Sequence, residues 1–381
     1  MRTGNFRIII KDNLIGFLWL HGDARNGEKK FVKKERCPAV SRLDFLDAAK
    51  GTGVLLVVAA HGCLLQMPWA SWIYEFYMPM FFVVSGYLFG RRRLAEQPAA
   101  CRRRIGRLVR TYFTGCGILF ALWFVLFPLR GKETDRLGRA VFSILYGRMS
   151  DAANPMLADV CWVGPMWFLT LMICAQLLLT MVLRMDNGAP PRRCLLAAVL
   201  LAAAQLLRLP PVLLPWCVDT APMAALLMLV SAWLGERQAL ERPFTRRTAA
   251  VCLCLAIPYL LLNDTYDLHL RYYGHWQDVR GALAFFAAGL CGSLLFLMLC
   301  RCLAVVPPLF SGLAALGRES MAVFIGHTFL LWTVDSLFLR LPEFPLSGAV
   351  RGAALLLAGT LVPLAGSLLV KRLRRRTPAA V

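Results

Sequence analysis

Residues 42–62 read RLDFLDAAKGTGVLLVVAAHG, an apolar run that begins with charged residues and ends in a histidine. At the rise of an α-helix, Lys50 and His61 lie roughly 16 Å apart along the axis. This spacing predicts a cation at the edge of a membrane and an imidazole inside the hydrocarbon. Because ionisable groups are costly at that depth, His61 is a candidate functional residue.

The composition indicates a protein that crosses a membrane many times. Of the 381 residues, 58% are hydrophobic and 17% are charged, whereas a soluble domain carries about 25% charged residues. The apolar residues come in blocks of about twenty, the length that spans a bilayer core. A net charge of +21 would suggest nucleic acid as the partner of a soluble protein. Here the cations cluster between the apolar blocks, so we expect a lipid bilayer and no nucleic acid as partner.

The apolar blocks predict an all-α, polytopic integral membrane protein with ten transmembrane helices. These lie at 46–67, 73–90, 109–129, 162–183, 193–208, 212–235, 248–263, 281–303, 319–340 and 348–370. Ten crossings leave both termini in the cytoplasm. The segments on that side then hold 33 of the 43 Lys and Arg residues, as the positive-inside rule requires.

This map divides the chain into three regions. Residues 1–40 form a basic N-terminal extension; an interfacial helix with a flexible linker, a disordered tail and an over-long start of the reading frame are all open interpretations. Residues 41–372 form the transmembrane domain, and residues 373–381 form a basic cytoplasmic tail. The 13 cysteines show no paired spacing, so we expect neither a disulfide scaffold nor a metal site.

Two histidines, His61 and His327, fall within predicted helices. A neutral imidazole in a dry pocket can act as a general base, and packing between helices is the alternative interpretation. Asp47 and Lys50 are three residues apart and share a helix face, so they can pair. Lys50 therefore either forms a salt bridge at the membrane edge or faces an anionic ligand.

The segment from Arg91 to Arg110 holds eight arginines and no lysine. A topology signal needs cations but does not prefer arginine, whereas the planar guanidinium suits bidentate binding of phosphate. Arg107 and Arg110 share one face at the start of the third predicted helix. A phosphate-bearing cytoplasmic ligand and a pure topology signal are both consistent with this run.

Three further patterns mark the predicted helices. They lie at 78–87, 164–169 and 317–327, and their candidate residues are Ser85, Trp167, Ser320 and His327. In the first pattern, a proline kink and small-residue packing explain the residues as well as catalysis does. In the second, the tryptophan suits either the aromatic belt of a membrane protein or a platform for a sugar.

Taken in this order, the blocks resemble the integral-membrane acyltransferase 3 family over about residues 42–371, nearest to its fucose 4-O-acetylase-like branch. The branch pattern Asp-x-Ala-Lys-Gly-x-Gly-x-x-x-Val-x-x-x-His is matched at Asp47, Lys50, Gly51, Gly53, Val57 and His61. The Arg-x-x-Arg element of the family falls on Arg107 and Arg110. Three residues depart from common family residues: Tyr77 from histidine, Thr170 from proline and Glu319 from asparagine.

The resemblance implies a membrane O-acyltransferase that moves an acyl group, usually acetyl, from cytoplasmic acyl-CoA to a hydroxyl of an envelope polysaccharide or lipid-linked sugar. It implies a multi-pass protein of the bacterial inner membrane, with acetyl-CoA as co-substrate and no metal or other cofactor. We expect His61 to be the general base, with an acyl-imidazole on it as a second possibility.

The resemblance also divides the other candidate residues between the two substrates. Acyl-CoA would be bound by Lys50, Arg107 and Arg110. The pocket or the acceptor side would be formed by Asp47, Ser85, Trp167, Ser320 and His327. Two alternatives of a different class remain. One is a transporter or flippase for a lipid-linked sugar. The other is a structural membrane protein, in which two buried histidines would be an unexplained cost.

Overall fold

The computed structural model describes a helical chain. It describes residues 43–62, 70–126, 137–148, 163–210, 213–243, 245–263, 278–339 and 348–376. No strand occurs within these ranges. The predicted extension at 1–40 and the last residues of the predicted tail, 377–381, lie outside them.

Within the described residues, ten long helices coincide with the ten predicted blocks. They are α2 (Asp44–Gly62), α3 (Ala70–Gly90), α4 (Gln97–Leu126), α6 (Trp167–Met185), α7 (Pro190–Leu206), α8 (Ala221–Glu236), α9 (Arg246–Asn263), α10 (Val279–Cys302), α12 (Ser320–Leu339) and α13 (Gly348–Arg376). Short 3₁₀ helices connect several of them: η1 (Leu94–Glu96), η3 (Gly164–Met166), η4 (Pro215–Cys217), η5 (Ala239–Glu241) and η6 (Leu303–Val305).

Fewer than ten of these helices meet the length and hydropathy expected of a membrane span. Five spans in the described part of the chain do so, those built on α4, α6, α8, α10 and α13. Counting α11 and α12 as one bent span gives six. The chain therefore carries the helices of a membrane protein, while the ten crossings and the cytoplasmic position of both termini stay predictions.

Two helices were not predicted, α5 (Leu137–Tyr146) and α11 (Pro307–Arg318). Both are shorter than the block of about twenty apolar residues from which spans were predicted. Helix α4 also begins at Gln97, well before the predicted start at 109. Arginine is a good helix former, so the arginine-rich segment continues the helix instead of ending it.

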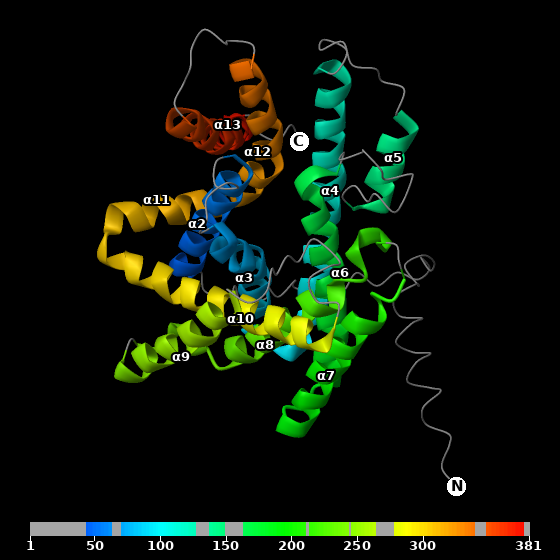
Figure 1. The fold of residues 1–381 in the computed structure, drawn as a ribbon, viewed down its shortest axis with the longest axis vertical. Helices are drawn as coiled ribbons and strands as arrows, with labels where there is room; N and C mark the ends of the chain where they lie inside the picture. The colour runs from blue at the N-terminus through cyan, green and yellow to red at the C-terminus, as the bar shows by residue number, and fades with distance from the viewer. Residues whose placement is uncertain are drawn as a thin grey trace, which may run out of the picture. The chain divides into compact units, whose positions relative to one another are not determined.

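Helices α6 and α8 form the centre of the described bundle. In each of their apolar windows 78% of the residues are buried, as expected for helices that are hydrophobic on all sides. Helix α6 contacts α4 and α8, while α3 packs against α8 and α10 (Figure 1). Helix α2 packs against α11, α12 and α13.

Glycines allow α2 and α11 to touch through their backbones. A Cβ atom added to Gly51 would overlap the carbonyl oxygen of Leu313, and one added to Gly317 would overlap that of Asp47. Such a close approach is possible only where both helices lack a side chain. Two glycines from the patterns noted in the sequence therefore have a packing role.

Replacing Gly317 with alanine should separate α2 from α11. Overpacking of this kind costs about 1–3 kcal/mol, so we expect a lower thermal midpoint of the detergent-solubilised protein, measured by size-exclusion chromatography after heating. Gly312→Ala is the matched control, since it lies on the same helix and a Cβ atom there would meet nothing within 4 Å. Equal midpoints for the two variants would contradict the packing role.

Candidate active site

Two histidines, from α2 and α12, form the centre of the candidate site. The rings of His61 and His327 lie edge to face, with centroids 5.2 Å apart and planes at 73°. His61 lies in the last turn of α2 and is exposed, whereas His327 is fully buried. Both residues are candidates from the sequence, and the structure brings them into contact.

Backbone hydrogen bonds fix the orientation of both imidazoles. The Nδ1 atom of His61 lies 2.8 Å from the carbonyl oxygen of Val57, and that of His327 lies 2.8 Å from the carbonyl oxygen of Phe324. A carbonyl oxygen only accepts, so we assign the proton to Nδ1 in each ring. The Nε2 atoms then carry the lone pairs. In the described part of the chain, Nε2 of His327 has no hydrogen-bond partner.

A row of aromatic rings connects the histidines to the start of α6. The ring of Phe324 lies 6.0 Å from that of His327 and 5.5 Å from that of Phe168. Trp167, the predicted sugar platform, lies 6.3 Å from Phe168. The first turn of α6 therefore forms a wall that continues to the histidine pair; we call Trp167 and Phe168 the α6 wall.

Helix α3 meets the end of α2 next to His61. The hydroxyl of Tyr74 donates to the carbonyl oxygen of Ala60 at 3.2 Å, and the ring of Tyr77 lies 5.8 Å from that of Tyr74. Both tyrosines therefore belong to the surroundings of the histidine pair. Of the two, the sequence patterns pointed only to Tyr77. Tyr74 could have been found from its spacing, because residues three apart lie on one helix face.

Four other predicted residues lie elsewhere on these helices. Asp47 and Lys50 form a salt bridge of 2.5 Å near the start of α2, so the predicted pair exists. Ser85 is buried on α3, and its hydroxyl has no partner among the described residues. Ser320 begins α12 just after the bend from α11.

Helix α4 exposes a stripe of arginines. Arg103, Arg107 and Arg110 are four and three residues apart, which puts them on one helix face, and all three are exposed. The Nε atom of Arg110 donates to the carbonyl oxygen of Gly106 at 3.1 Å. Within the described ranges none of the three forms an ion pair. We call these residues the arginine stripe.

Arg104 lies beside the stripe, and sequence analysis did not single it out. Its guanidinium lies 3.8 Å from the sulfur of Met172 on α6, in a half-buried position. The sequence contains a pattern that could have identified Arg104, because Arg104 and Arg107 repeat the Arg-x-x-Arg spacing of Arg107 and Arg110. A guanidinium between two membrane helices is expected to face the interior of the bundle, where it contacts an anion or a water-filled cavity.

Arg91, in the same run, has a structural role instead. Its Nε atom lies 2.7 Å from a carboxylate oxygen of Glu241, and the hydroxyl of Tyr87 donates to that carboxylate at 2.9 Å. These bonds tie the end of α3 to η5. The run of eight arginines therefore divides into residues that hold the fold and residues that a ligand can reach.

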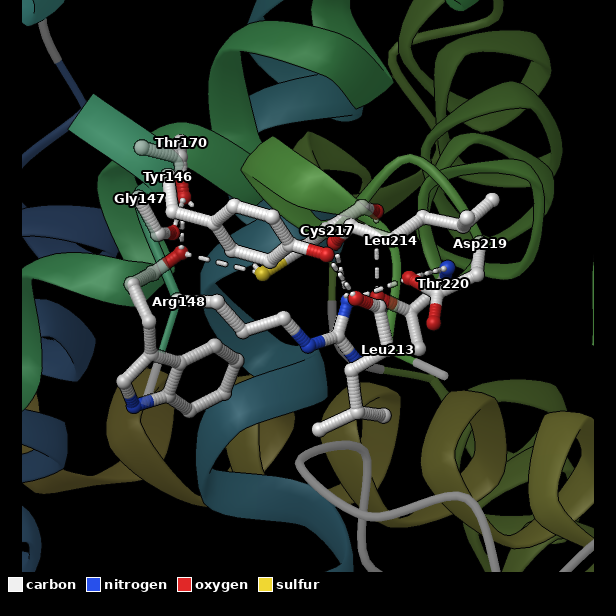
Figure 2. Close-up of polar contacts among 10 residues, drawn as sticks. Tyr146, Gly147, Arg148, Thr170, Leu213, Leu214, Cys217, Asp219 and Thr220 are labelled. Carbon is white, nitrogen blue, oxygen red and sulfur yellow. Dashed lines mark hydrogen bonds and ion pairs between the residues drawn. The ribbon is translucent and has the colours of Figure 1, made fainter. Parts of the chain in front are cut away.

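A second polar cluster lies where α6 and α8 begin (Figure 2). Arg148 and Asp219 form an ion pair in which both side chains are buried. The guanidinium also donates to the carbonyl oxygen of Leu214 at 3.2 Å. Sequence analysis missed this cluster because its partners are 71 residues apart, and no short pattern joins them.

The histidine pair offers a base, and the stripe offers exposed cations. Both Nδ1 atoms lie against backbone carbonyl oxygens, so Nε2 is the basic nitrogen of each ring. Among the described residues, no group of three or more His, Cys, Asp or Glu side chains gathers as a metal site would. A base and a set of exposed guanidiniums are components of group transfer from a phosphate-bearing donor.

Comparison with known proteins identifies the family. A model of the acyltransferase 3 family, described as an acyltransferase domain, matches residues 43–372. No curated protein and no solved structure gives a significant match. The matched region runs from the start of α2 into α13, so it includes both histidines and the arginine stripe. The chain therefore belongs to the acyltransferase 3 family and is a membrane acyltransferase.

Proposed function

We propose that the chain transfers an acyl group, acetyl by default, from cytoplasmic acyl-CoA to a hydroxyl of an envelope polysaccharide or lipid-linked sugar. It does so in the bacterial inner membrane, with acetyl-CoA as co-substrate. The observation that carries the proposal is the pair of histidines whose Nδ1 protons are bound by the backbone. Family membership supports the reaction class.

His61 acts as the general base. Its Nε2 atom removes the proton of the sugar hydroxyl while the hydroxyl oxygen attacks the carbonyl carbon of the thioester. The carbon–sulfur bond then breaks, and the departing CoA thiolate takes the proton back from Nε2. The bond from Nδ1–H to Val57 holds the ring in place and stabilises the imidazolium that exists between these steps.

Acylation of His61 itself is the second route. Attack by Nε2 on the thioester would expel CoA as a thiolate and leave an acylated imidazolium; the sugar hydroxyl would then attack the acyl carbon, and Nε2, released as the leaving group, would take up the hydroxyl proton. Both routes use the same atom, and they differ in whether CoA leaves before the acceptor reacts. Neither route uses Ser85, which lies on α3 and has no base among its described partners.

The arginine stripe binds the phosphates of acyl-CoA. CoA carries several negative charges, and guanidiniums bind phosphate oxygens in pairs. Lys50 contributes less, because its ammonium is already paired with Asp47. Arg107 and Arg110 therefore provide most of the attraction, and the half-buried Arg104 extends it toward α6.

An enzyme is favoured over a transporter or flippase for a lipid-linked sugar. A flippase would share the helical architecture and the buried ionisable groups. It would not need a basic nitrogen next to a row of aromatic rings, nor a stripe of guanidiniums on one helix. The acyltransferase family match also favours the enzyme.

Replacing His61 with alanine should lower the turnover number for transfer of acetyl from acetyl-CoA by about 10²- to 10⁴-fold, because the reaction loses its general base. The assay measures transfer of radiolabelled acetyl to a panel of alkyl glycosides by the purified protein. The thermal midpoint of the variant should match that of the wild type, since His61 is exposed. Full activity in the variant would exclude the mechanism.

Replacing Arg107 or Arg110 with glutamine should raise the KM for acetyl-CoA about tenfold or more, because each change removes a charge-assisted hydrogen bond. The KM for the glycoside should stay unchanged. Arg102→Gln is the matched control, an exposed arginine of the same helix that lies off the stripe. The same KM for all three variants would show that the stripe does not bind the donor.

A further inference from the structure

The Arg148–Asp219 cluster takes no part in the proposed reaction, yet it is almost fully buried. Arg148 is 3% exposed and Asp219 is 1% exposed. Removing two charges from water is costly, so a buried ion pair is weak evidence for stability and stronger evidence for a defined geometry. The contacts around the pair show which geometry it defines.

The cluster joins the end of α5 to the turn before α8 (Figure 2). Arg148 follows α5 and bonds to Asp219 and to the carbonyl oxygen of Leu214. Asp219 also accepts from the backbone N–H of Thr220 at 2.9 Å. Beside them, the hydroxyl of Tyr146 donates to the carbonyl oxygen of Leu213 at 2.6 Å. These two segments are therefore held as one unit.

Thr170 joins this unit to the first turn of α6. Its hydroxyl lies 2.8 Å from the carbonyl oxygen of Gly147 and 2.7 Å from that of Trp167. The thiol of Cys217 also reaches the carbonyl oxygen of Trp167, at 3.7 Å. The backbone of Trp167 is thus fixed by contacts that come from α6 itself and from the turn before α8.

The turn before α8 is strained at Trp216 and Cys217. Their φ angles are 56° and 57°, in the left-handed region that residues other than glycine rarely adopt. The indole N–H of Trp216 donates to the carbonyl oxygen of Leu145 at 2.9 Å, which holds the turn to α5. Strained backbone of this kind persists only where the surroundings over-determine it, and it is concentrated at functional sites.

We propose that these residues form a clamp that positions the α6 wall and thereby sets the affinity for the acceptor. The clamp consists of Gly147, Arg148, Thr170, Cys217 and Asp219. The α6 wall continues through Phe324 to His327, and η3, just before the wall, contacts α12. The inference rests on the proposed function, because it assigns the acceptor to the wall beside the histidine pair.

The clamp acts on the acceptor side and not on the donor side. Helix α4 faces the clamp with Tyr112, whose hydroxyl donates to Ile144 and whose ring lies 5.8 Å from Trp216. At about 100° per residue, Tyr112 lies on roughly the opposite face of α4 from the arginine stripe. The contact of α4 with the clamp and the guanidiniums of the stripe therefore lie on different faces of the helix, so we expect a change in the clamp to affect the α6 wall more than the stripe.

The test compares Thr170→Val with Thr170→Ser in the purified full-length protein. Valine keeps the size of the side chain and removes the hydroxyl, whereas serine keeps the hydroxyl. Loss of one hydrogen bond should raise the KM for the acceptor about threefold to tenfold in the valine variant. The KM for acetyl-CoA and the turnover number should stay within about twofold. The acceptor probe is the alkyl glycoside that the wild type acetylates fastest.

A second variant, Asp219→Asn, keeps the shape of the clamp and removes the charge that pairs with Arg148. Asp219→Asn should raise the KM for the acceptor more than Thr170→Val does. A lower thermal midpoint in the valine variant with an unchanged acceptor KM would mean a structural role only and would overturn the inference. Inactive wild-type protein would overturn the proposed function and this inference together, whereas an active wild type with equal KM values in all variants would overturn the clamp alone.

Discussion

Helices α2 and α11 touch through their backbones at Gly51 and Gly317, and the position of the histidine pair depends on this contact. Each histidine lies ten residues after one of these glycines; Gly51 and His61 share α2, where this is roughly 15 Å of helix. The bend of 78° between α11 and α12 turns the second helix so that the two paths meet again. His61 and His327 are in contact because α12, after this bend, packs against α2.

The histidine pair, the arginine stripe and the clamp are held in different ways. The histidines are oriented by carbonyl oxygens of their own helices. The arginine stripe lies on the exposed face of one helix, where guanidiniums can turn toward a ligand. The clamp joins segments that are far apart in the chain. The proposed base and the α6 wall are therefore rigid, whereas the proposed donor site has room to adapt.

Sequence patterns predicted the helices well and the contacts between them poorly. Apolar blocks located every long helix of the described residues, because hydropathy over twenty residues is a local property. The pairing of Asp47 with Lys50 was also local and was predicted. The contact of His61 with His327 and the pair of Arg148 with Asp219 depend on packing between distant segments. Helix α11 escaped notice because its twelve residues are too few for a span.

Helix α4 carries all of its arginines in its first half and is apolar in its second half. Each arginine near the centre of a membrane helix costs about 2.5–3.5 kcal/mol on insertion. Arg104 finds its place only against Met172 of α6, which is synthesised later. The packing of α4 is therefore completed only after α6 has been made.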